Sequence, residues 1–434
     1  MIIQEFSFGN FRSFKDIQTL NLASAKIKSK YESIDENNII TDPKYKDTSF
    51  LKSKAIYGAN ACGKSNIVKA LVTFIKIIRQ SVKDEKVLNL VDTFKLSTET
   101  DNKPSFFQLI FWIDSVRYRY GFEIDDKKIY AEWLFGKSGE RELTYFIRDD
   151  QKIIKIDKTN FSEGYKLISL FDNNTSDNEI FRDNSLFLSS IASLGFGKLS
   201  KLLIDNIVSI SIINGLGHNG LFSYASDSLN DENKKKYILD FLKYGDTGIE
   251  DLDTFDIPLE NSSKKSESGN NSPENDKKRR LTISKRKKYD KNLEFLENQY
   301  FPFSIMESEG TLKLFELSPF IFKALKENSP LIIDEFDARF HPLLTKKIIK
   351  LFNSNKNLSS QLIFTTHDTN LLSADLLRRD QIEFVEKDKY GASHLYSLVK
   401  FKGIRNTASF EKDYINGKYG AIPFLGDFEK LLNF

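Results

Sequence analysis

The stretch IYGANACGKSN, residues Ile56–Asn66, decides the fold of this chain. Its matches to the pattern G-x-x-x-x-G-K-[ST] are Gly58, Gly63, Lys64 and Ser65. In that pattern backbone N–H groups surround a phosphate, the lysine reaches the outer phosphate oxygens, and the hydroxyl holds Mg²⁺. The apolar segment Lys54–Tyr57 before the loop is typical of a strand, and apolar residues at helical spacing follow through Asn66–Val82. The sequence therefore predicts a phosphate-binding loop between a strand and a helix.

The composition is that of a globular protein with room for two or three domains. The chain has 434 residues, of which 40% are hydrophobic and 13% aromatic. Its 64 Lys and Arg nearly balance its 61 Asp and Glu, so any basic surface for nucleic acid has to be local. The only cysteine, Cys62, lies inside the loop, so we expect no internal disulfide and a cytoplasmic protein. We expect Cys62 itself to serve as a small residue at a tight turn. Neither a signal peptide nor a membrane span is expected, because polar residues interrupt Met1–Phe14 and no apolar run reaches a spanning length.

Two regions of the first 160 residues have the alternation of β-strands. Ile2–Phe8 is one predicted strand, and it leads into the turn Asn-Phe-Arg-Ser-Phe, which presents Arg12 between aromatic residues. Alternating apolar residues from Phe106 to Ile156, with a turn at Asp114-Ser115, predict an antiparallel β layer. In this layer we expect Gln108 to be an ordinary polar strand residue rather than a glutamine that contacts Mg²⁺.

Helical spacing prevails between about residues 162 and 253. The predicted helices are Asn184–Leu194, Lys198–Ile213 and Lys234–Tyr244. They are interpreted as a helical lobe inserted into the main domain. No apolar heptad lasts for three or four repeats, so long coiled-coil arms are excluded. Residues 260–276 are dominated by Ser, Asn, Lys and Glu, which predicts a linker without regular structure.

A basic run follows directly. Eight of the twelve residues Lys277–Lys288 are Lys or Arg, so the predicted disordered basic linker covers about residues 260–290. Such a run neutralises phosphates and would bind nucleic acid without sequence preference. It serves equally well as a solvated tether, because Tyr289 is nearly the only aromatic residue there for base stacking.

A second set of motifs lies after residue 300. Glu307-Ser308-Glu309-Gly310-Thr311 precedes a predicted helix, Leu312–Lys326, and then a buried strand, Pro330–Ile333. The strand ends in Asp334 and Glu335, whose side chains point to opposite faces as long as the strand continues. We expect Asp334 to orient Mg²⁺ through water and Glu335 to position or deprotonate an attacking water.

Two motifs that contain a histidine follow the acidic pair. Asp337 and His341 belong to the stretch Phe-Asp-Ala-Arg-Phe-His-Pro, in which a histidine beside proline is also suited to capping the next helix. His367 comes directly after the predicted strand Gln361–Thr365, in the sequence Thr-His-Asp. An imidazole at that place hydrogen-bonds a terminal phosphate, unless it is satisfied by Asp368 or by the backbone.

In this order the motifs resemble the ABC-type ATPase heads of the SMC and RecF group. The fold class that the resemblance implies is α/β, an ABC-type P-loop NTPase head with a mixed, largely parallel core sheet, an antiparallel β subdomain and an inserted helical lobe. The implied domains are residues 1–160 with the phosphate loop and the antiparallel layer, 161–300 with the helical lobe, and 301–434 with the signature, Walker B acid, D-loop and switch histidine. The implied cofactors are ATP and Mg²⁺, and the implied activity is hydrolysis of ATP to ADP and phosphate.

The resemblance also implies roles for individual residues. ATP contacts are implied for Arg12, Asn60, Gly63, Lys64, Ser65, Asn66, Ser308, Gly310 and Asp337, Mg²⁺ contacts for Ser65 and Asp334, and catalytic roles for Glu335 and His367. By spacing alone, Arg12 fits a surface position equally well. In the family, the signature serine and glycine bind the γ-phosphate held by a second copy, and the D-loop aspartate contacts that copy. Self-association into a head-to-head dimer or a higher oligomer is therefore expected.

Several motifs narrow the resemblance. They are similar to motifs of the RecF-like ATPases of bacterial antiphage and abortive-infection loci, including those of PARIS-type and Septu-type systems. The motifs are E-S-E-G-T, I-I-D-E-F-D-A-R-F-H-P, T-T-H-D, the run Arg379–Ile382 with Val385–Lys387, and Tyr419–Pro423. This resemblance implies a sensor or scaffold that controls a partner effector, a toxin or nuclease encoded nearby. The alternative is a RecF-like DNA-binding clamp of repair or recombination, with Lys277–Lys288 on the phosphates. A nuclease with a metal-binding TOPRIM domain is not expected, because no Asp-x-Asp pair follows His367.

Overall fold

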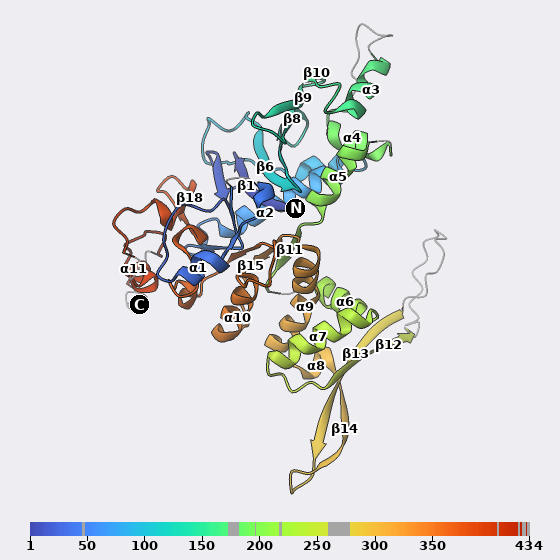
Figure 1. Cartoon of the computed structure of the whole chain (residues 1–434), viewed down its shortest axis with the longest axis vertical. Helices are drawn as coiled ribbons and strands as arrows, with labels where there is room; N and C mark the ends of the chain where they lie inside the picture. The colour runs from blue at the N-terminus through green and yellow to red at the C-terminus, as the bar shows by residue number, and fades with distance from the viewer. Residues whose placement is uncertain are drawn as a thin grey trace. The chain divides into compact units, whose positions relative to one another are not determined.

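The chain folds into two compact units in a computed structural model (Figure 1). The described residues are 1–45, 48–171, 182–195, 197–216, 219–258, 278–405, 408–423, 426–427 and 431. The first unit comprises Met1–Ile213, Ala324–Asp337 and Thr345–Phe434, and the second comprises Asn214–Lys323 and Ala338–Leu344. The second unit is thus inserted into the first in sequence, at two places.

Six strands form the core sheet of the first unit, in the order β11-β15-β16-β5-β17-β18. Their bounds are β11 Ser211–Asn214, β15 Leu331–Asp334, β16 Leu362–Thr365, β5 Ser53–Tyr57, β17 Ile382–Lys387 and β18 Ser393–Ser397. Strands β15, β16, β5 and β17 are parallel to their neighbours among these four, and β18 is antiparallel to β17. All residues of β5, β15 and β16 are buried, as in sheets covered on both faces. Because parallel strands end at the same edge, the segments that follow β5, β15 and β16 lie together there.

A second, antiparallel sheet has seven strands in the order β10-β9-β8-β7-β6-β1-β2. Their bounds are β10 Lys152–Ile156, β9 Leu143–Asp149, β8 Ile129–Lys137, β7 Val116–Ile124, β6 Ser105–Ile113, β1 Ile2–Gly9 and β2 Gln18–Asn21. The predicted antiparallel layer is confirmed, including the turn at Asp114-Ser115, where Asp114 has a positive φ of 51°. Gln108 accepts a hydrogen bond from Trp133 Nε1 at 3.0 Å, so it is a polar residue of the strand, as expected.

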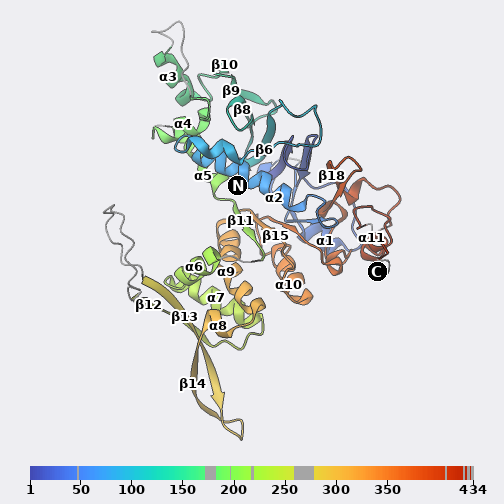
Figure 2. The same ribbon diagram turned by 180° about the vertical axis from the view of Figure 1, so that it is seen from behind.

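Helix α2, Lys64–Gln80, packs between the two sheets (Figures 1 and 2). Its Phe74 ring contacts Phe6 of β1 at 5.7 Å and Phe122 of β7 at 5.2 Å between centroids. Ile56 and Ile332 of the core sheet belong to the same buried cluster as the apolar residues of α2. The helical spacing read from the sequence therefore reflects a helix that is covered on two sides.

Three further helices of the first unit pack into this cluster: α3 Ser162–Phe171, α4 Phe187–Ser193 and α5 Lys198–Val208. Buried Glu132 of β8 fixes the start of α4, because it accepts bonds from the backbone N–H of Phe187 (2.6 Å) and Leu188 (2.9 Å). Burial raises the pKa of Glu132, and the charge of Arg148 opposes that shift. The predicted single lobe over 161–300 therefore differs from the observed division, since these helices share the core of the first unit.

The predicted helix Lys198–Ile213 ends earlier than expected. Helix α5 stops at Val208, and Ser211 begins strand β11 at the edge of the core sheet. Ser211 N donates to Pro330 O at 3.1 Å, and the isoleucine pair that follows suits a strand. Short apolar runs are compatible with both periods, so tertiary pairing decided the boundary.

The second unit combines helices with a three-stranded antiparallel sheet. Its elements are α6 Asn219–Ser228, α7 Glu232–Tyr244, β12 Asp251–Pro258, β13 Lys278–Tyr289, β14 Phe295–Pro302, α8 Phe303–Met306 and most of α9 Glu309–Glu327. Leu242, Leu252, Phe303 and Phe315 are at the centre of its core. The predicted disordered linker is wrong from Lys278 onward, because β13 pairs with both β12 and β14. Residues 259–277 lie outside the described residues. Because most residues of β13 are charged, its sequence was not recognised as a strand, although Thr282 and Ser284 alternate as buried residues on one face.

The structure describes further helices and strands. They are α1 Glu32–Asn37, β3 Ile39–Ile40, β4 Phe50–Leu51, α10 Pro342–Phe352 and α11 Phe410–Ile415. In the part of the chain that the structure describes, no single helix has the length and apolar content to cross a membrane, although the bent pair α4–α5 meets that test by length and composition.

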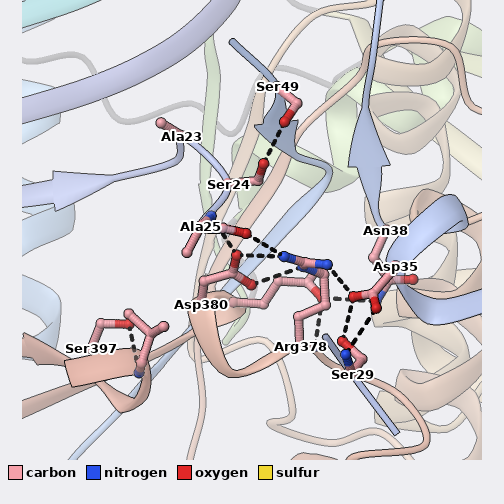
Figure 3. A network of polar contacts seen from close by, with 12 residues as sticks. Ala23, Ser24, Ala25, Ser29, Asp35, Asn38, Ser49, Arg378, Asp380 and Ser397 are labelled. Carbon is pink, nitrogen blue, oxygen red and sulfur yellow. Dashed lines mark hydrogen bonds and ion pairs between the residues drawn. The ribbon is translucent and has the colours of Figure 1, made fainter. Parts of the chain in front are cut away.

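Arg378 ties the segment before β17 to the N-terminal part of the chain (Figure 3). Its guanidinium donates to both carboxylate oxygens of Asp380 (3.0 and 2.9 Å) and to Ala25 O (2.9 Å), and it pairs with Asp35. The carbonyl of Asp380 accepts a bond from Lys54 Nζ of β5 at 2.6 Å. This network holds β17 beside β5, the strand that leads into the phosphate loop.

A pH-dependent stability is expected from Glu316 in helix α9. Burial of its carboxyl raises the pKa from the ordinary 4.5 to about 7, and Arg339 opposes the shift. Since the folded state then binds more protons than the unfolded state between these values, the stability contributed by Glu316 falls as pH rises through this window. Glu316→Gln should therefore gain stability relative to the wild type between about pH 5 and pH 8. Urea unfolding at about pH 5 and about pH 8 measures this gain in the free energy of unfolding. The control is exposed Glu327→Gln on the same helix, and a gain that is equal at the two pH values would contradict the prediction.

Candidate functional site

The phosphate loop connects β5 to α2 at the carboxyl edge of the core sheet. Gly63 has a φ of 118°, which suits glycine, and α2 begins at Lys64 with no side-chain cap among the described residues. The first N–H groups of α2 therefore point into the loop without a side-chain acceptor. Lys64 Nζ donates to Gly58 O at 2.8 Å and to Ala59 O at 3.1 Å, so the buried ammonium lies inside its own loop.

Two serines brace the loop from distant parts of the chain. Ser393 Oγ, from β18, donates to Cys62 O at 2.5 Å, and Ser393 N donates to Ser13 O at 2.7 Å. Asn66 Nδ2 donates to Ser13 Oγ at 2.9 Å. A Cβ on Gly63 would lie 2.7 Å from Ser393 Oγ and 2.8 Å from Ser13 Oγ, so this position requires glycine for space as well as for φ. The loop is thus held against two other segments of the first unit.

The acids follow β15 as predicted. Asp334 is the last residue of the strand and is buried, and its Oδ1 accepts from Thr365 Oγ1 at 2.6 Å. The same Thr365 Oγ1 accepts from Glu335 N at 2.8 Å, which links the ends of β15 and β16. Glu335 has a positive φ of 55°, so the chain turns there and the strand alternation ends. Asp334 and Glu335 therefore differ in backbone conformation, the first in a strand and the second in a turn.

Asp337 and His367 are in contact within one chain. The carboxylate of Asp337 accepts from His367 N at 3.2 and 3.3 Å. The imidazole of His367 has no hydrogen-bond partner among the described residues, and the carboxylate of Asp368 instead accepts from Asn370 N at 2.9 Å. The satisfied histidine of the alternative interpretation is therefore not observed in the described residues.

The electrostatics show that these groups lie close together. Burial lowers the pKa of Lys64, while the nearby Asp334, Asp337 and Glu335 oppose that shift. Burial and then the charge of Lys64 lower the pKa of His367, so its imidazole is neutral at pH 7. A neutral imidazole offers one donor and one acceptor. The structure thus brings the lysine, the acids and the histidine of separate motifs to one site.

Arg12 lies next to this site through its neighbour Ser13. Its φ is 51°, and its backbone N–H donates to Asp92 O at 2.6 Å. The buried Nε of Arg12 has no acceptor among the described residues. A guanidinium N–H in this situation gains a charge-assisted hydrogen bond when an anion enters. Asn60 is exposed at the tip of the loop.

Ser308 and Gly310 belong to the second unit, where they begin helix α9. Ser308 Oγ accepts from Thr311 N at 3.2 Å, as a capping residue does. A Cβ on Gly310 would lie 3.0 Å from Arg339 O, because the backbone at Arg339 approaches the start of this helix. His341 Nδ1 accepts from Leu343 N at 3.2 Å, so His341 caps α10, as the alternative interpretation held.

Three residues of the site were not identified from the sequence. Thr365 connects the two acids, and Ser13 and Ser393 brace the loop. The position of Thr365 between an apolar strand and Thr-His-Asp was the only signal for it. Ser393 lies 330 residues after Gly63 with no local motif, so only the pairing of β18 with β17 could place it.

A phosphate loop after β5, an acidic pair at the end of β15 and a histidine after the intervening β16 define the fold of this protein as an ABC-type P-loop NTPase head with a mixed, largely parallel core sheet. Residues 55–373 match the family described as "AAA domain, putative AbiEii toxin, Type IV TA system", and the chain belongs to this family. The predicted fold class is confirmed.

The wider comparisons add two distant structures. No curated protein matches the sequence. The SMC head domain from Thermotoga maritima is similar at 11% identity, covering 92% of this chain and 99% of that chain, with a TM-score of 0.40. The SMC head bound to the C-winged helix domain of ScpA is similar at 13% identity, covering 92% and 98%, with a TM-score of 0.41.

Proposed function

We propose that this protein binds and hydrolyses ATP with Mg²⁺. The observation that carries the proposal is the convergence of Lys64, Asp334, Glu335 and His367 at one edge of the core sheet, in mutual electrostatic range. Three segments that are far apart in the sequence supply the four groups that phosphoryl transfer needs: a cation, a metal-orienting acid, a water-positioning acid and a neutral donor.

The residues present fit a nucleoside triphosphate and its metal ion. The uncapped N-terminus of α2 and the loop N–H groups suit the phosphates, and Arg12 Nε supplies a further donor without a partner among the described residues. Mg²⁺ is usually held by one or two protein oxygens together with phosphates and water, which Ser65 and Asp334 would provide. Asn60, Gly63 and Asn66 line the same loop as ATP contacts. When bound, Mg²⁺ neutralises charge that develops on the phosphates.

Glu335 and His367 would both act at the terminal phosphate, in different roles. Glu335 orients the attacking water and takes up its proton, since its carboxylate follows directly on the metal-orienting Asp334. His367 donates its single N–H to the terminal phosphate, and Asp337 holds its backbone in place. Because the lowered pKa keeps this imidazole neutral, protonation in acid would add positive charge beside Lys64.

Hydrolysis should require two copies of the protein. Ser308, Gly310 and Asp337 are the residues through which one copy would complete the site of the other. The N-terminus of α9 is suited to the γ-phosphate, because the first N–H groups of a helix favour an anion and the hydroxyl of Ser308, which accepts from Thr311 N, still has its own hydrogen to donate.

Mixing two inactive variants tests this arrangement. Lys64→Ala disables the phosphate loop of the chain that carries it. Ser308→Arg disables the start of α9 through which that chain would complete the site of its partner. In a symmetric dimer, an equal mixture should recover about a quarter of wild-type turnover, because half of the dimers carry one intact site. Steady-state phosphate release measures this, with each variant alone as control. A mixture as inactive as its components, or turnover per chain that stays constant on dilution below the dissociation constant, would contradict shared sites.

The biological role proposed is that of a sensor or scaffold subunit in an antiphage defence system that controls a partner effector. The description of the family, which names a toxin of a toxin–antitoxin system, supports this context. Co-expression with the products of adjacent genes and a phage challenge test it. Protection that is lost with Lys64→Ala, together with an ATP-dependent complex with an adjacent toxin or nuclease, is expected. Protection unaffected by Lys64→Ala would count against an ATP-driven sensor.

A further inference from the structure

The sheet of the second unit exposes aromatic and basic side chains on one face. Alternate residues of a strand point to opposite faces, and buried Leu252, Thr282 and Ser284 mark the face that covers the core. The opposite face, which we call the outer face, includes the aromatic and basic residues Phe255, Lys285, Lys287, Tyr289, Phe295 and Tyr300 and the acidic residues Asp251 and Asp253.

The outer face is aromatic to an unusual degree for a surface. The exposed fractions of its aromatic side chains are 54% for Phe255, 52% for Tyr289, 56% for Phe295 and 55% for Tyr300. In the strand register Tyr300 is opposite Lys285, and Phe295 is opposite Tyr289. Pairing of β14 with β13 thus brings two aromatic residues to the basic run, where the sequence shows only Tyr289 nearby.

The cations are distributed unequally between the two faces. On the core-facing side, Arg286 pairs with Glu307 (2.6 Å) and Lys288 pairs with Glu297 (2.7 Å). On the outer face, Lys285 has no ion-pair partner among the described residues. Lys287 pairs with Glu250 at 3.2 Å, but both side chains are nearly half exposed, and such pairs contribute little. On the same face, Asp251 and Asp253 pair with Lys235 at 3.2 and 3.0 Å, so Lys285 remains available to a phosphate.

Part of this surface is a two-stranded ribbon. Strand β12 pairs with β13 only as far as Lys285, and beyond it β13 and β14 continue alone past helices α6, α7 and α8 (Figure 1). All residues of β14 from Phe295 to Tyr300 are exposed. An isolated two-stranded hairpin is marginally stable in water, so a ligand that covers its aromatic residues would also order it.

We infer that the outer face binds single-stranded nucleic acid. Unpaired bases would stack on the exposed rings, and Lys285 and Lys287 would neutralise phosphates between them. The pairs Lys285–Tyr300 and Tyr289–Phe295 are four residues apart along the ribbon, about 13 Å, which leaves room for nucleotides between successive stacking positions. A duplex hides its base faces, so the chemistry of this surface favours single strands. The inference goes beyond ATP hydrolysis and does not depend on it.

Fluorescence anisotropy of labelled oligothymidylate and oligouridylate of about 20 nucleotides tests the inference with the full-length protein. Tyr300→Ala and Phe295→Ala should each weaken binding by about 5- to 150-fold, and Tyr300→Phe should restore it. Lys285→Gln should reduce the dependence of log affinity on log salt by about 0.7. Lys288→Gln, on the other face and paired with Glu297, is the matched control and should change the slope little. The two oligonucleotides distinguish DNA from RNA, and a duplex of equal length should bind less tightly.

Three results would overturn the inference. One is absence of binding at 50 mM salt, and another is affinity unchanged by Tyr300→Ala and Phe295→Ala together. The third is loss of self-association, rather than of nucleic-acid binding, in those two variants, which would make the outer face a protein contact. Thermal unfolding confirms that the variants are folded. Lys64→Ala should bind the oligonucleotides like the wild type, so failure of the proposed ATPase activity would be seen separately.

Discussion

Glu335→Gln is expected to lower the rate of ATP hydrolysis by about 10²- to 10⁴-fold while ATP affinity stays close to that of the wild type. The amide keeps the size of the side chain but cannot take up the proton of the attacking water. Asp334, with its bond from Thr365, and Lys64 remain in place to hold Mg²⁺ and phosphate. The variant should therefore accumulate the ATP-bound, associated form.

Lys64→Ala should instead lower the affinity for ATP, because it removes the buried ammonium from the loop. Loss of a charge-assisted contact to phosphate is expected to weaken ATP binding by about 10- to 150-fold. Equilibrium titration with a fluorescent ATP analogue and single-turnover hydrolysis separate the two variants. The controls are Glu99→Gln and Lys76→Ala, both exposed in the same unit. Equal losses of ATP affinity in Glu335→Gln and Lys64→Ala would contradict the assigned roles.

Arg378→Ala is expected to lower the free energy of unfolding by about 3–5 kcal/mol. Only 3% of the Arg378 side chain is exposed, and its removal leaves the buried carboxylate of Asp380 without its cation (Figure 3). Arg378→Lys should lose less, since it keeps the charge but not the planar fork that bonds both oxygens. Because the network also fixes β17 beside β5, the variant should bind ATP more weakly near its unfolding midpoint.

Urea unfolding followed by circular dichroism measures this loss. The matched control is Arg379→Ala, whose side chain makes one hydrogen bond among the described residues, to Ile404 O at 3.3 Å. A midpoint for Arg378→Ala equal to that of the control would show that the network does not stabilise the fold. The run Arg379–Ile382 has a structural role, since Asp380 and Gln381 are buried and make hydrogen bonds within the fold.

The predictions that held came from patterns within a few residues. The loop between β5 and α2, the strands of the antiparallel layer and the capping by His341 all depend on local backbone geometry. The predictions that failed concerned the grouping of elements. Helices α3, α4 and α5 were assigned to a lobe with the second unit, and strand β13 was taken for a linker. Helical spacing shows that a face is buried but not which core covers it, and the charges of β13 concealed its pairing.

The sequence by itself determined the phosphate loop, the acidic pair and the order of the motifs, because each is a short run whose chemistry and backbone shape are encoded locally. Only the tertiary structure decided that Ser13 and Ser393 brace the loop and that Thr365 joins the two acids. It alone also placed Phe295 and Tyr300 beside the basic run. These arrangements depend on strand register between distant segments, and register is set by hydrogen bonding and burial across the whole sheet rather than by neighbours in the sequence.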